Sequence, residues 1–305
     1  MATTSKRLTI RKSFFPIAIV IVIFFFLGRG FLKNYSQLSQ YKTELNFIYL
    51  SVAILFICLS SLLGPFIWKR ILSFLGTSLS YRESLKICSL SSLTKYIPGK
   101  VWPVLGRVYL TRDRHINENI ILTSQGIEWI LMILSGILVF LLSIPFGANT
   151  AQIEKISWLV ILIPFLIILL HPFILQIFVN ISSKIFHFDN FTLDINFFNV
   201  AEAVLLFSVF WLLEGTAIFF LIKTLIFISP NLLPIAIGFF AISTVVGLLS
   251  FLTPAGLGVR EGMLVFLLSF YLPTAVIVIV SLLSRICIVS VEFFRAGIIT
   301  IIQRS

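Results

Sequence analysis

Apolar residues form long blocks along this chain, and few charged residues interrupt them. A helix that crosses a membrane needs about 20 consecutive apolar residues, because it rises about 1.5 Å per residue through a hydrocarbon core about 30 Å thick. Six blocks reach this length, at residues 13–32, 45–68, 120–144, 156–181, 197–222 and 275–302. The pattern predicts an all-α polytopic membrane protein with about six full transmembrane helices.

Two more apolar segments, at residues 87–110 and 233–271, are broken near their centres by Pro and Gly. These residues interrupt helical hydrogen bonding, and non-helical backbone at membrane depth is stable only where protein or water covers it. We therefore expect two broken re-entrant helical hairpins, which bring the number of apolar segments to eight. The alternatives are a cytoplasmic amphipathic loop for the first segment and two ordinary spans for the second.

Both breaks have the same order of residues: a Pro, a nearby Gly, and then an Arg. They are Pro98, Gly99 and Arg107 in the first segment, and Pro254, Gly256 and Arg260 in the second. This repetition suggests an inverted repeat, in which the broken helices of a transporter meet near the membrane midplane and form the substrate site.

The composition agrees with a membrane protein, since 59% of the 305 residues are hydrophobic, only 11% are charged, and the mean hydropathy is +1.09. This leaves too little polar surface for a soluble domain of the same size. We expect one integral membrane domain over residues 1–305, with a basic cytoplasmic N-terminus at 1–12 and a helical membrane bundle at 13–305. The first block is expected to be an uncleaved anchor, because no small-residue cleavage site follows it.

Lys and Arg outnumber Asp and Glu by 23 to 12, a formal net charge of +11. The basic residues lie in short gaps between apolar blocks and not on one helix face, which argues against a nucleic-acid partner. In the predicted layout, thirteen of them lie on the side of the N-terminus and four on the other side. Because Lys and Arg accumulate in cytoplasmic loops, we expect a cell-membrane protein with both termini in the cytoplasm.

The sequence contains no recognisable metal site, cofactor motif or catalytic motif. Cys58, Cys88 and Cys287 stand alone in apolar surroundings, and the three His residues are far apart. A phosphate-binding loop of the Walker type is also missing from the sequence. We therefore expect no bound cofactor and no enzymatic activity.

Charged residues inside the apolar segments are costly, so they are kept for pairing or for function. Gly256 and Gly258 allow a ligand to approach the backbone, and the half-helix after them offers unpaired N–H groups with Arg260 in its first turn. Glu261 is expected to pair with Arg260 or Arg285, or to receive a cationic group of the ligand. These features suit a phosphodiester, which a bidentate Arg binds well. The candidate substrate-binding residues are Pro98, Gly99, Lys100, Arg107, Glu128, Pro254, Gly256, Gly258, Arg260, Glu261, Arg285 and Glu292.

At these positions the sequence resembles a known family. Residues 94–102 and 254–261, Glu128 near the start of a span, and Arg285 followed by Glu292 are similar to the lysylphosphatidylglycerol synthase transmembrane-region family, also called flippase-like integral membrane proteins. The resemblance extends from residue 45 to the end of the chain. It departs at Trp129, where the family commonly has an Arg after the Glu.

This resemblance implies a lipid-translocation module. In two-part members of the family, a cytoplasmic domain transfers an amino acid to phosphatidylglycerol, and the membrane domain is credited with moving the product to the outer leaflet. Since the sequence stops soon after its last apolar block, we expect a stand-alone member without the synthase domain. Stand-alone members often accompany polysaccharide or glycolipid assembly, which implies membrane lipids as partners, together with a glycosyltransferase or a lipid-modifying enzyme.

The leading hypothesis is a lipid translocase, a lipid transport protein that binds an anionic phospholipid or lipid-linked headgroup between the two broken helices. One alternative is a non-transporting scaffold of a glycan or lipid biosynthesis complex. A second alternative is a lipid-linked glycosyltransferase. Such an enzyme needs carboxylates on a sizeable loop outside the bilayer, and the predicted loops are short and hold few of them.

Overall fold

Helices account for all the regular structure in the part of the chain that the computed structural model describes, namely residues 29, 45–97, 101–114, 116–147, 157–177, 180, 196–250 and 256–302. Five of these helices are long and apolar enough to cross a membrane. One of the five, at residues Pro230–Leu249, includes the short helix η6 (Pro230–Leu232) at its start. The five are α2 (Phe47–Phe74), α5 (Glu118–Ser143), α9 (Phe197–Leu225), α10 (Leu233–Leu249) and α12 (Thr274–Ile302). The predicted α-helical membrane protein is confirmed, while the number of six full spans stays a prediction.

Two of the six predicted blocks are not among these five helices. Block 13–32 lies outside the described residues, apart from Arg29. Block 156–181 begins with η5 (Ser157–Leu162) and α7 (Ile163–Leu169), and the helix then ends at a turn before Pro172. The turn has a local cause, because a Pro disfavours helical backbone at the residue before it.

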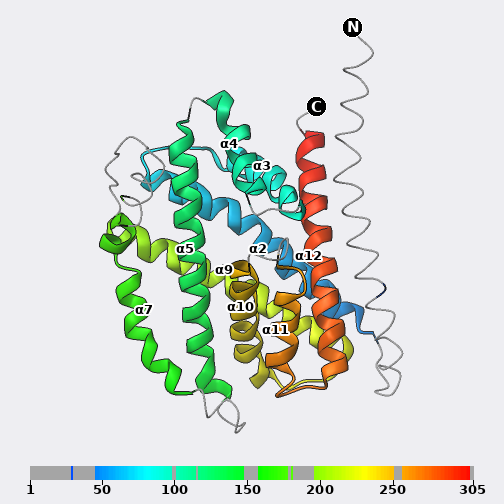
Figure 1. Ribbon diagram of the computed structural model, residues 1–305. Helices are drawn as coiled ribbons and strands as arrows, with labels where there is room; N and C mark the ends of the chain where they lie inside the picture. The colour runs from blue at the N-terminus through cyan, green and yellow to red at the C-terminus, as the bar shows by residue number, and fades with distance from the viewer. Residues whose placement is uncertain are drawn as a thin grey trace.

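Each broken segment forms two helices that pack against each other. In the first hairpin, α3 (Tyr81–Ser92) continues into η2 (Leu93–Tyr96) and packs against α4 (Trp102–Thr111). In the second hairpin, α10 packs against α11 (Val259–Leu268). Figure 1 shows the first hairpin in the upper part of the molecule and the second in the lower part. The depth of the two hairpins in a membrane stays a prediction.

The long helices form a bundle around these hairpins. In Figure 1, α5 and α12 stand upright, while α2 and α9 cross the molecule obliquely. α2 packs along α9, and α10 packs against both α5 and α9. The main apolar core lies where α5, α9, α10, α11 and α12 meet, and its largest fully buried side chains are Trp211, Phe239 and Phe240.

Polar side chains join the long helices inside the bundle. The indole N–H of Trp68 on α2 donates to Ser124 of α5 at 3.0 Å, and that of Trp211 on α9 donates to Ser135 of α5 at 3.1 Å. A buried indole without a partner would leave its N–H unsatisfied, so each bond fixes the rotation of α5 against its neighbour.

Helix starts follow from polar caps in the sequence. Asn46, Asn117 and Asn196 accept backbone N–H groups at the starts of α2, α5 and α9. Ser80 and Glu83 form a capping box at the start of α3. The backbone N–H of Ser80 donates to Glu83, and this bond is the main reason why the pKa of Glu83 is lowered.

We predict that Gly215→Ala destabilises the protein by about 1–3 kcal/mol, the usual cost of overpacking a tight core. A Cβ on Gly215 of α9 would lie 2.3 Å from the Cα of Ile237 on α10, so the two helices would have to move apart. Gly297→Ala is the matched control, because nothing lies within 4 Å of the added Cβ on α12. Thermal unfolding of both variants in detergent checks this, and an equal midpoint for the two would contradict the packing.

Candidate functional site

A charged cavity lies at the centre of the molecule, between the two hairpins and the long helices. It has two lobes that share lining residues, among them Lys95, Arg107, Glu128 and Arg260. One lobe, of about 240 Å³, is also lined by Glu214, and we call it the Glu214 lobe. The other, of about 320 Å³, is also lined by Trp129, and we call it the Trp129 lobe. The central cavity therefore collects charges from both broken segments.

Arg107 of the first hairpin is held by Glu128 of α5. Both terminal nitrogens of Arg107 donate to this carboxylate, one of them at 3.3 Å, and each of the two side chains is 13% exposed. Gln125 donates to Glu128 at 2.9 Å, and the guanidinium of Arg107 stacks on Trp68 at 4.6 Å from the ring centroid. The ion pair fixes α4 against α5 at the edge of the cavity.

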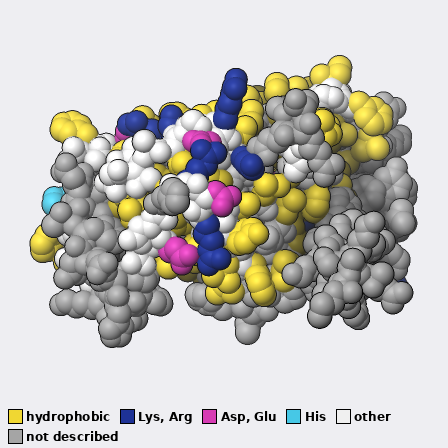
Figure 2. Space-filling model, turned by 90° about the horizontal axis from the view of Figure 1, so that it is seen from above, with side chains coloured by type: hydrophobic (Ala, Val, Ile, Leu, Met, Phe, Trp, Pro, Cys, Tyr) yellow, Lys and Arg dark blue, Asp and Glu magenta, His cyan; other side chains and the backbone are white. Residues whose placement is uncertain are grey.

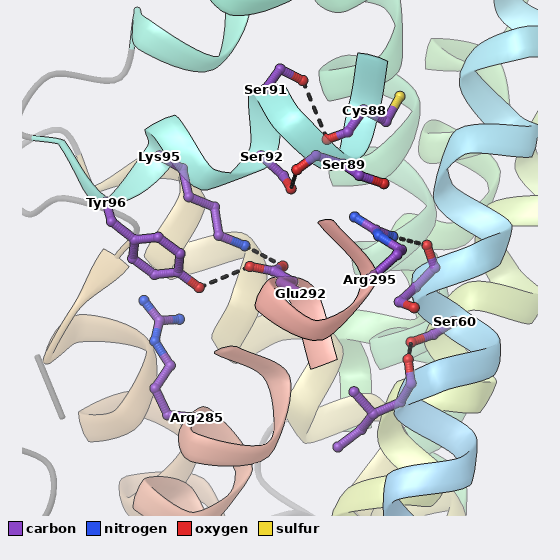
Figure 3. Close-up of polar contacts among 12 residues, drawn as sticks. Ser60, Cys88, Ser89, Ser91, Ser92, Lys95, Tyr96, Arg285, Glu292 and Arg295 are labelled. Carbon is purple, nitrogen blue, oxygen red and sulfur yellow. Dashed lines mark hydrogen bonds and ion pairs between the residues drawn. The ribbon is translucent and has the colours of Figure 1, made fainter. Parts of the chain in front are cut away.

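Glu292 of α12 is held by the other side of the first hairpin. Lys95 donates to Glu292 at 2.5 Å, and the hydroxyl of Tyr96 donates to its second oxygen at 2.8 Å. Figure 3 shows both side chains converging on Glu292 from η2. This contact places the end of α3 and η2 over the middle of α12.

Arg285 of the same helix faces the second hairpin. Its Nη1 lies 3.9 Å from Oε1 of Glu261 on α11, and the two side chains are 4% and 13% exposed. The sequence left several partners open for Glu261, and the structure pairs it with Arg285. Since Arg285 and Glu292 lie two turns apart on one helix, α12 contacts both hairpins through one face.

Arg260 differs from the other buried cations of the cavity. It lies in the first turn of α11, is 8% exposed, lines both lobes, and stacks on Phe240 at 4.6 Å from the ring centroid. Among the described residues its guanidinium has no ion pair, and its buried Nη2 has no hydrogen-bond partner. A positive charge is therefore directed into the cavity without an ion pair to a described carboxylate.

Glycines at the bend of the second hairpin explain how Arg260 comes so close to α10. Gly256 has φ +69°, and a Cβ there would lie 2.8 Å from the carbonyl oxygen of Gly247. A Cβ on Gly247 would in turn lie 2.8 Å from the Cβ of Arg260. A side chain at either position would push Arg260 away from the cavity.

The start of α11 differs from the sequence expectation. Gly258 is the N-cap, with φ +84°, and its N–H donates to the side chain of Glu261 at 2.7 Å. One N–H at this helix start is thus taken by a carboxylate of the protein itself, whereas the sequence predicted unpaired N–H groups here. Neither Gly258 nor Glu261 lines a lobe of the cavity.

The remaining candidate residues divide into two groups. Pro98, Gly99, Lys100 and Pro254 lie outside the described residues. Six of the candidates line the central cavity, and these are Arg107, Glu128, Gly256, Arg260, Arg285 and Glu292.

Sequence reasoning left three charged lining residues out of the candidate set. They are Lys95, Glu214 and Arg295. Nη1 of Arg295 donates to the carbonyl oxygen of Ser61 on α2. For all three the available signal was a charge inside an apolar stretch, but sequence spacing could not say which of these charges meet.

These features define a class: a multi-pass α-helical membrane protein whose interior holds a charged cavity between two broken helical hairpins. The family model for the lysylphosphatidylglycerol synthase TM region matches residues 13–292, so the chain belongs to this family. The resemblance carried by the two breaks is thereby confirmed. None of the curated proteins matches the chain.

We predict that Arg107→Leu destabilises the protein by about 3–5 kcal/mol, because it leaves Glu128 buried without its cation. The double variant Arg107→Leu/Glu128→Leu should regain part of this loss, since no charge is then left unpaired. Thermal unfolding in detergent measures both effects.

The matched control for that prediction is Arg112→Leu. Arg112 pairs with Glu118 at the start of the same helix α5, but their side chains are 62% and 55% exposed. An exposed pair contributes about 1 kcal/mol at most, so the control should change stability little. Equal losses for Arg107→Leu and Arg112→Leu would contradict the buried pairing.

Proposed function

We propose that this protein binds an anionic lipid headgroup, such as a phosphodiester, in the central cavity and passes the lipid across the bilayer. The observation that carries the proposal is Arg260, a buried cation that lines a cavity between two broken hairpins and has no ion pair among the described residues. Membership of a family of membrane proteins named for lysylphosphatidylglycerol synthase supports a lipid as the ligand.

The charge of the cavity favours an anion. Its lining holds three carboxylates, Glu128, Glu214 and Glu292, and five cations, which are Lys95, Arg107, Arg260, Arg285 and Arg295. The formal sum is +2, and it is +1 when Glu261, the partner of Arg285, is included. An Arg suits a phosphodiester because its planar guanidinium donates two parallel hydrogen bonds to two phosphate oxygens.

The arrangement of the hairpins supports movement between leaflets. One hairpin lies in the upper part of the bundle and the other in the lower part (Figure 1). Residues of both hairpins line the cavity. Rocking of one broken element against the other would open such a cavity to the two sides in turn. The ion pairs that tie the hairpins to α5 and α12 would then hold the closed state.

The proposal also includes the orientation of the protein in the membrane. Figure 2 shows charged side chains gathered in a band on the end of the molecule where the first hairpin lies. Its exposed cations include Arg82, Arg112 and Arg114. From the positive-inside rule we infer that this end, and with it the end of α12, faces the cytoplasm.

We assign no reaction to the cavity. Glu128 and Glu292, the carboxylates nearest the first hairpin, accept hydrogen bonds from Arg107, Lys95 and Tyr96. Carboxylates held in this way are fixed in position, which favours binding over proton transfer to a substrate. The ligand passes through unchanged under this proposal.

We predict that Arg260→Ala abolishes lipid movement in proteoliposomes. Acyl-labelled phosphatidylglycerol in phosphatidylcholine vesicles reports the exchange of leaflets, because an external quencher reaches only the outer lipid. The wild-type protein should exchange the label faster than protein-free vesicles. The Arg260→Ala variant should fall to the protein-free rate, because the headgroup loses its cation.

Arg112→Ala is the matched control for this experiment, since the residue is exposed and does not line the cavity. It should keep the wild-type rate. Exchange by the wild-type protein at the protein-free rate would overturn the proposal and favour a scaffolding role. Equal exchange by the wild type and by Arg260→Ala would show that the cavity is not the path.

A further inference from the structure

Glu214 is the buried carboxylate of the cavity that no described cation holds. It lies in the middle of α9, is 7% exposed, and lines the Glu214 lobe together with Arg260. Within the described residues it has no ion pair. Its partner is the hydroxyl of Ser60 on α2, at 2.5 Å from Oε1. An ionised carboxylate in such a position is costly, which makes the protonated form competitive.

The hydrogen bonds of Ser60 also favour a proton on Glu214. The Ser60 oxygen lies 2.5 Å from the carboxylate and 2.9 Å from the carbonyl oxygen of Ile57. A hydroxyl has one proton to donate, and two acceptors compete for it here. With a proton on Glu214, the carboxyl donates to Ser60 and Ser60 donates to Ile57, so that both contacts are satisfied.

The titratable groups that face Glu214 come from several elements. The lining of its lobe includes Cys88 of α3, Lys95 of η2, Arg107 of α4, Glu128 of α5, Arg260 of α11, and Glu292 and Arg295 of α12. α2 and α10 line it with uncharged residues such as Ser60 and Thr244.

Among these groups, Glu214, Arg260 and Arg295 have no ion pair within the described residues. Arg107 pairs with Glu128, Lys95 pairs with Glu292, and Arg295 donates to the carbonyl oxygen of Ser61. An ionised Glu214 would therefore partly neutralise Arg260 across the lobe. A protonated Glu214 leaves the full charge of Arg260 for a ligand.

We propose that the central cavity takes up a proton on Glu214 together with the anionic headgroup on Arg260, so that lipid movement is coupled to proton movement. This inference rests on the proposed function and adds a co-substrate to it. The proton comes from water and adds to one carboxylate oxygen of Glu214, and the headgroup forms no covalent bond. One proton and one negative charge enter together, so the cavity keeps the formal charge that it had before binding.

Coupled binding has a measurable consequence. By linkage, a proton that strengthens headgroup binding is itself bound more tightly when the headgroup is present. The affinity for the headgroup should therefore rise as the pH falls, by up to about tenfold per pH unit for one linked proton. The phosphodiester of phosphatidylglycerol stays ionised across the neutral range, so the lipid itself does not contribute to this slope.

We predict that the purified full chain binds phosphatidylglycerol in mixed micelles more tightly at low pH, in a series from about pH 5 to about pH 9, which lies above the ordinary pKa of a Glu. Trp129 and Trp211 line the cavity, so their fluorescence reports binding. In weakly buffered solution, a pH dye should record an uptake of up to about one proton per bound lipid. The Glu214→Gln variant should bind the lipid without a pH slope and without proton uptake.

Glu202→Gln is the matched control, because Glu202 lies on the same helix but pairs with Arg70 at 2.6 Å outside the cavity. It should keep the wild-type slope. If Glu214→Gln does not fold, infrared spectra of the wild type serve instead, since headgroup binding should increase the carbonyl band of a protonated carboxyl.

The outcomes separate this inference from the proposed function. Binding of phosphatidylglycerol with equal affinity at all pH values would overturn the inference and leave the proposed function standing. The same follows if Glu214→Gln keeps the wild-type slope, or if binding leaves the infrared band unchanged. Failure of the wild type to bind the lipid at any pH would overturn both.

Discussion

The constraint on which the rest of this structure depends is the cost of a charge inside a membrane protein. Charged side chains in the interior are stable only when an opposite charge or a full set of hydrogen bonds compensates them. Arg107 and Glu128 join α4 to α5, while Arg285 and Glu292 on α12 reach α11 and η2. Because these pairs bridge different elements, charge compensation also holds the two broken hairpins in place around the cavity.

Arg260 and Glu214 depart from this rule, and they do so in the same lobe of the cavity. Each is more than nine-tenths buried, and neither has an ion pair among the described residues. The other carboxylates of the cavity have a cation as partner, so the absence of an ion pair at Arg260 and at Glu214 needs an explanation. The simplest explanation is that an anionic ligand compensates the positive charge of Arg260, and that a proton neutralises the carboxylate of Glu214.

Much of the fold could be predicted because hydropathy is a local property. The blocks that became α2, α5, α9 and α12 and the two Pro/Gly breaks are visible in the sequence. Block 156–181 was wrong as one continuous helix, because Pro172 ends the helix within an apolar run. The capping of the second half-helix was not foreseen, since Glu261 accepts the N–H of Gly258 three residues before it.

By itself, then, the sequence determined the membrane class, the family and the position of the breaks, since each depends on residues close together in the chain. Only the tertiary structure decided which charges are paired. Lys95 and Glu292 are 197 residues apart, and Ser60 and Glu214 are 154 apart, so no spacing rule connects them. The free cation at Arg260 is equally invisible in the sequence, because a missing partner is defined only when all the neighbours in space are known.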